Sequence, residues 1–169
     1  MSYYNSIERA LQSQSLSAFK SALKTGPLDA FFQEKAGQMS LWHLTCYEPV
    51  DVRFLKALGE YAQKQNYDIP IDMLVKRDPS HKGRTAYGIC TAFAMTDKMQ
   101  WLARQGADVT LGSKKHTPME IATYFYGERS DDPDEDIERL VVRHTALQQK
   151  RTIAAQLPEK THTARRSKI

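Results

Sequence analysis

Apolar side chains recur at helical spacing in several short segments of the chain. In residues 97–105, Met99, Leu102 and Ala103 fall at positions i, i+3 and i+4, on one face of a helix. Residues 51–65 carry a similar stripe. A third stripe follows Pro133 and consists of Ile137, Leu140, Val141, His144 and Leu147. These segments predict a series of short amphipathic helices.

Residues that begin and end helices stand beside these segments. Thr85 is a suitable N-cap for a helix over residues 86–94, and Asp97 for a helix that continues to Gln105. Gly106 follows, where a helix commonly ends in a left-handed residue. Both helices have fewer than about three turns, a length that is marginal in isolation. We therefore expect neighbouring segments to hold them.

The same start signal occurs three times. The segment Thr117–Ala122 repeats the pattern of Thr85–Cys90 after 32 residues, and the segment Ser40–Thr45 has a related form. In the third copy Pro118 occupies the first helical position and Glu120 completes a capping box. Paired helices with a period of about 33 residues are typical of stacked repeat arrays.

These elements resemble ankyrin repeats. The resemblance rests on Thr-Pro-Met at residues 117–119, Ser-Leu-Trp-His-Leu at residues 40–44 and Gly-Ala-Asp-Val at residues 106–109. It implies an all-α solenoid of about four repeats within residues 1–149, in which each unit buries its apolar stripe against the next. Ala86 and Gly88 depart from the proline and histidine that the family usually has, and the first unit lacks the Thr-Pro start.

An insertion at residues 66–82 separates the second unit from the third. It contains five apolar side chains, which argue against disorder: Ile69, Ile71, Met73, Leu74 and Val75. Two interpretations stay open. The insertion either packs along the side of the stack or forms a finger that contacts a partner.

The charge is concentrated at one end. Residues 150–169 carry a net charge of +5, whereas residues 1–149 carry −1. The neutral body argues against a nucleic-acid-binding domain. We expect the tail to be largely disordered beyond a helical first turn, and association with nucleic acid or an anionic membrane through this tail is the alternative function. Its basic end, residues 165–168, is a targeting signal, a phosphate contact or a solvated terminus.

The sequence offers little support for an enzyme. His43 falls on the family's structural histidine, and the resemblance implies that Cys46, like Cys90, is buried. Asp132, Asp134 and Asp136 have the spacing of a calcium loop, but Ile137 and Arg143 replace the glycine and glutamate that such a loop needs. We therefore expect no cofactor and no metal. The N-terminus lacks the features of a signal peptide and no apolar run could span a bilayer, which indicates a cytoplasmic protein.

The resemblance implies a protein-binding module, an adaptor, inhibitor or targeting protein that is monomeric when free. Proteins of this family also occur among bacterial effectors that act in a host cell. Partner contacts are expected on the concave face, from loop tips and the groove side of the inner helices. The predicted residues are Met39, Tyr47, Glu48, Arg84, Ala92, Phe93, His116, Tyr124 and Phe125. Phe93 and Phe125 are either exposed there or packed between inner helices.

Overall fold

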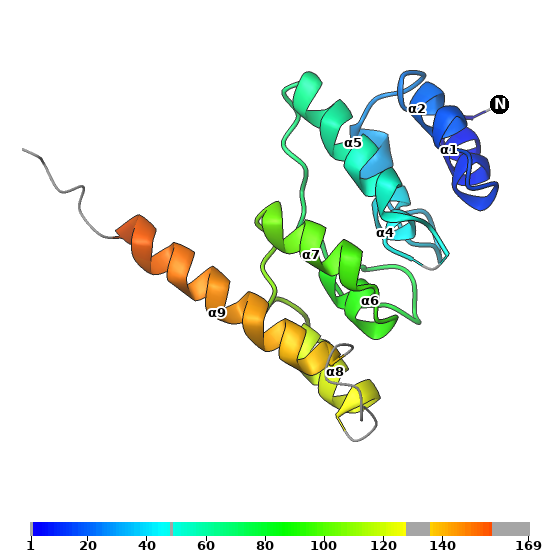
Figure 1. The fold of residues 1–169 in the computed structure, drawn as a ribbon. Coiled ribbons are helices and arrows are strands. Elements are labelled where there is room, and N and C mark those ends of the chain that lie inside the picture. The colour runs from blue at the N-terminus through cyan, green and yellow to red at the C-terminus, as the bar shows by residue number, and fades with distance from the viewer. Residues whose placement is uncertain (1, 48, 128–135, 157–169) are drawn as a thin grey trace, which may run out of the picture.

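The computed structural model describes residues 2–47, 49–127 and 136–156, and within these ranges the chain contains helices and no strand. The helices form two rows (Figure 1). The inner row consists of α1 (Tyr3–Gln12), α4 (Leu41–Thr45), α6 (Ala86–Ala92) and α8 (Pro118–Tyr126). The outer row consists of α2 (Leu16–Leu23), α5 (Val52–Lys64), α7 (Thr96–Arg104) and α9 (Ile137–Gln156). A single turn, α3 (Asp29–Phe32), precedes α4 and was not predicted.

The two rows contact each other pair by pair and along their length. Each inner helix packs on the outer helix that follows it: α1 on α2, α4 on α5, α6 on α7 and α8 on α9. Within each row, consecutive helices also touch. Helical pairs therefore stack in chain order, and the buried stripe of each pair rests on the next.

The predicted caps explain where the inner helices begin. The side-chain oxygens of Ser40, Thr85 and Thr117 accept hydrogen bonds from backbone N–H groups in the first turns of α4, α6 and α8. Thr117 and Glu120 form the predicted capping box. Gly106 has φ of +94°, which confirms the left-handed residue after α7. These local signals define the helix starts because each one satisfies a backbone donor that the helix leaves free.

Three predicted features of the outer helices are wrong. Helix α7 begins at Thr96 after Met95, so Asp97 lies in the first turn and does not cap it. Helix α9 continues to Gln156, so residues 150–156 are helical over more than the one turn expected of the tail. Leu147 is 46% exposed, whereas the other members of its predicted stripe are buried. The start predicted for this helix at Asp132 and Pro133 lies outside the described residues.

The core is continuous along the stack. At the N-terminal end Phe19 makes edge-to-face contacts with Phe31 and Phe54, at ring-centroid distances of 6.2 and 5.1 Å. Trp42, further along the inner row, is fully buried. Both thiols are buried as predicted, and the Cys90 Sγ donates a weak hydrogen bond to the Cys46 carbonyl oxygen at 3.6 Å. No helix among the described residues is long and apolar enough to cross a bilayer.

The insertion at residues 66–82 lies against the stack, which favours the packing interpretation. Val75 is buried, and its N–H donates to the carbonyl of Arg84 at 2.9 Å. The Glu34 carboxylate accepts the backbone N–H groups of Lys76 and Arg77. The insertion thus joins the first unit of the stack to the loop before α6.

His43 is the buried end of another such connection. Its Nε2 lies 2.9 Å from the carbonyl oxygen of Met73, which can only accept, so Nε2 carries the proton. In the neutral ring, Nδ1 then accepts from the Ser40 hydroxyl at 2.9 Å. Burial lowers the pKa of His43 from 6.5 to about 4 and outweighs the opposing hydrogen bond to Met73.

This lowered pKa predicts a loss of stability in acid. Because folded His43 stays neutral down to about pH 4 while the unfolded chain binds a proton near pH 6.5, stability falls as the pH decreases through this window. Between pH 7.5 and 5 the wild type should lose about 2 kcal/mol more unfolding free energy than His43→Gln, measured by urea denaturation. Equal losses in the two proteins would contradict the assignment.

Gly83 provides a second test of how the loops are joined. It has φ of +82°, and a Cβ at this position would collide with the Ser113 side chain of the next loop. Gly37 also has a positive φ, of +69°, but nothing lies within 4 Å of its Cβ position. We expect Gly37→Ala to cost about 1 kcal/mol from strain alone. Gly83→Ala should cost about 2–4 kcal/mol, because overpacking adds to strain. Thermal denaturation measures the stability of both variants. Equal losses of stability would show that Ser113 leaves room for a Cβ at Gly83.

Candidate partner-binding face

Two aromatic side chains meet where neighbouring inner helices end. Tyr47 directly follows the C-cap residue of α4, and Phe93 is the C-cap residue of α6. Their rings pack edge to face at 4.8 Å between centroids, and both residues are half-buried. His81 of the insertion completes the cluster, at 5.5 Å from Tyr47 and 6.1 Å from Phe93. Phe93 is therefore packed on one side and accessible on the other.

A pocket of about 400 Å³ lies beside this cluster, between the loop before α6 and helix α8. Its lining residues are Arg84, Lys115, His116, Glu120, Ile121, Tyr124 and Phe125. Tyr124 is 83% exposed and Phe125 41% exposed, and their rings stand perpendicular to each other at 5.0 Å. The pocket thus presents two exposed aromatic rings beside basic side chains.

Arg84 joins the pocket to the aromatic cluster. Its Nη1 lies 3.4 Å from Nδ1 of His81, and its Nε is buried with no hydrogen-bond partner among the described residues. Burial lowers the pKa of Arg84 from its ordinary value, but arginine remains protonated near neutral pH. A buried donor that is left unsatisfied is costly.

The pocket has a surplus of positive charge. Glu120 is its single acidic lining residue, and the carboxylate accepts hydrogen bonds from the Thr117 hydroxyl at 2.6 Å and backbone N–H at 3.1 Å. These bonds lower the pKa of Glu120 and keep the carboxylate at the start of α8. Arg84 and Lys115 therefore remain to receive an external acceptor.

We call the surface formed by Tyr47, His81, Arg84, Phe93, His116, Tyr124 and Phe125 the aromatic face. It brings together six of the predicted site residues. Met39 and Ala92 do not join it. Met39 is only 6% exposed, so its predicted place at an accessible loop tip is wrong: it packs in the core beside Tyr4, whose hydroxyl donates to the Met39 carbonyl. Ala92 is half-buried, and Glu48 lies outside the described residues.

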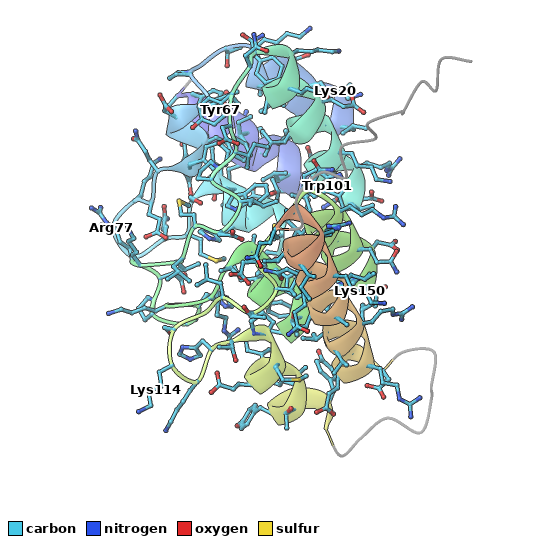
Figure 2. The ribbon with its side chains drawn as sticks, turned by 90° about the vertical axis from the view of Figure 1, so that its left-hand side faces the viewer. Lys20, Tyr67, Arg77, Trp101, Lys114 and Lys150 are labelled. Atoms are coloured by element: carbon cyan, nitrogen blue, oxygen red, sulfur yellow. The ribbon has the colours of Figure 1, made fainter. Side chains whose placement is uncertain are left out.

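His81 of this face, and Lys115, which lines the adjoining pocket, were not predicted. His81 lies in the insertion, where the repeat pattern gives no register, and it reaches the aromatic pair only because the insertion folds back. Lys115 directly precedes His116 and has φ of +72°. In the sequence, the adjacent lysines Lys114 and Lys115 were the feature that could have indicated a basic contribution from this loop. Figure 2 shows Lys114 and Arg77 at the same edge of the molecule, away from Lys150 on α9.

The described ranges contain no candidate metal-binding cluster. No group of three or more His, Cys, Asp or Glu side chains there could hold a metal ion. Burial raises the pKa of the Cys90 thiol well above its usual value, which makes it a poor nucleophile. Of the calcium-like acids, Asp132 and Asp134 lie outside the described residues, while Asp136 accepts from the Arg139 N–H at the start of α9.

Comparisons with known proteins do not assign the chain to a family. No protein-family model matches the chain, and no curated protein matches its sequence.

Proposed function

We propose that the chain is an ankyrin-type repeat protein that binds a protein partner through the aromatic face. Four helical pairs support the repeat assignment, because all four inner helices begin with a Ser or Thr cap. Aromatic residues stand at the ends of the inner helices of the second and third units, Tyr47 after α4 and Phe93 after α6. The inner helix of the fourth unit carries Tyr124 and Phe125. In ankyrin-like stacks this side of the inner helices is the concave binding face. The role is that of an adaptor, inhibitor or targeting protein in the cytosol.

The observation that carries the proposal is the exposure of Tyr124 and Phe125 beside Arg84. Aromatic and arginine side chains are enriched among residues that dominate binding energy. Tyr124 is the most exposed large hydrophobic residue of the described chain, at 83%, and it lines the pocket beside Arg84 and Lys115. An apolar partner side chain in this pocket would cover both rings and lie beside the cationic side chains of Arg84 and Lys115.

The main test compares an aromatic substitution with a matched one elsewhere. Tyr124→Ala should weaken the complex with a partner isolated by affinity capture about thirtyfold, because an interface anchor contributes about 2 kcal/mol or more. Ile153→Ala is the control, since Ile153 is 59% exposed but lies on outer helix α9. Its affinity should change less than about twofold, within the usual range for contacts outside a hot spot. Isothermal titration calorimetry measures both.

Phe93→Ala should also weaken binding, with a measurable loss of stability because Phe93 packs on Tyr47 and His81. A partner that loses affinity with Ile153→Ala but not with Tyr124→Ala would use the outer row and refute the proposal. Loss of binding on deletion of residues 157–169, with steep salt dependence, would instead favour the tail and its association with nucleic acid or anionic membranes.

A further inference from the structure

A second hollow lies on the outer row, between α7 and α9, and encloses about 530 Å³. Its lining residues are Gln100, Ala103, Arg104, Gly106, Ala107, Val109, Leu140, Arg143, His144, Leu147, Gln148, Arg151 and Thr152. We call it the α7–α9 groove. Its volume is in the range of about 300–1,000 Å³ that ligand sites occupy. It shares no lining residue with the pocket of the aromatic face.

The groove is strongly basic. Arg104 enters from α7, and Arg143 and Arg151 enter from α9, one helical turn to either side of Leu147. No Asp or Glu lines it, and none of the three arginines forms an ion pair with an acid of the described residues. Arg151 donates to the Ala103 carbonyl at 3.0 Å, so one guanidinium is held across the groove.

One carboxylate, that of Asp108, lies beside the groove and offsets part of this charge. It accepts hydrogen bonds from the Thr110 hydroxyl at 2.7 Å and from Gln148 Nε2 at 3.0 Å, and the three guanidinium groups outnumber it. His144 shares the basic environment: burial lowers its pKa, and Arg143, Arg104 and Arg151 lower it further. Its Nδ1 lies 2.7 Å from the Tyr87 hydroxyl, which fixes the ring at the base of the groove. An anionic ligand would offset the mutual repulsion of the three guanidinium groups.

The apolar part of the lining indicates which anion fits. Leu147 is 46% exposed and Ala103 is half-buried, so these two side chains present aliphatic surface, whereas Leu140, Val109 and Ala107 lie buried beneath them. No Phe, Tyr or Trp lines the groove. Single-stranded nucleic acid is usually held by bases stacked on aromatic rings as well as by basic residues. Aliphatic surface flanked by arginines instead suits a peptide with carboxylates and an aliphatic side chain.

We infer that the α7–α9 groove binds an acidic, aliphatic peptide segment of a partner protein. Carboxylates of the segment pair with Arg104 and Arg143, and an aliphatic side chain covers Leu147. This surface lies on the row opposite to the aromatic face, so the inference stands independently of the function proposed above. It gives the chain a second binding surface in addition to the aromatic face.

The test uses a short fluorescein-labelled peptide of alternating glutamate and leucine, and a matched peptide with glutamine in place of glutamate. Fluorescence anisotropy should show that the wild type binds the glutamate peptide about tenfold more tightly, as expected for several charge pairs together. Arg104→Gln and Arg143→Gln should each reduce that affinity about fivefold, the upper end for partly exposed pairs. Leu147→Glu, which places a carboxylate in the groove, should abolish binding.

Lys150→Gln is the matched control, because Lys150 is an exposed cation on the same helix but does not line the groove. Its effect should stay below about twofold, as for a distant screened charge. Each of the variants Arg104→Gln, Arg143→Gln and Lys150→Gln removes one positive charge, so all three proteins have the same net charge. Arg104 and Arg143 are exposed, and their side chains form no hydrogen bond with another described residue, so their variants should melt at the wild-type temperature.

Three results would overturn the inference. Equal affinity for the two peptides would show that carboxylates are not recognised. An equal loss with Lys150→Gln would show general charge attraction without a site. Tighter binding of an oligothymidylate, lost with the same arginine variants, would assign the groove to nucleic acid.

Discussion

The structure depends on the contact between consecutive helical pairs. Helix α4 has 5 residues and α6 has 7, and neither length is stable alone in water. Their stability comes from burial against both neighbours in the inner row and against the outer helix of the same pair. A substitution in one unit therefore acts on the next through the shared core, as in other quasi-linear stacks.

Loop contacts supplement this core on the side away from the outer row. His43 binds the insertion at Met73, and the Val75 N–H binds the next loop at Arg84. The Gly83 carbonyl in turn accepts from the Ser113 N–H at 2.8 Å. These bonds place Arg84 and His116 next to each other, so the aromatic face is held by backbone geometry as well as by its own side chains.

Local signals in the sequence predicted the inner helices well, because caps such as Thr85 and Thr117 act through a few neighbouring atoms. They predicted the outer helices less well. Asp97 has the chemistry of a cap, yet α7 begins one residue earlier because helix boundaries depend on packing as well as on the capping side chain.

The repeat register of the sequence predicted six residues of the candidate site, which are Tyr47, Arg84, Phe93, His116, Tyr124 and Phe125. His81 could not be placed, because only the folded path of the insertion brings it to Tyr47. Met39 was misplaced because its burial depends on the first unit, where the repeat pattern is weakest.

The paired thiols of Cys46 and Cys90 have a consequence for observing this molecule in motion. Both are fully buried at the seam between α4 and α6, and the sulfur of one touches the backbone of the other's helix. A thiol reagent can reach them only when that seam separates, since exposure of the sulfur requires local opening. The reaction of these two thiols therefore reports on opening of the contact between the second and third units. The rate of thiol labelling measures how often the stack opens there.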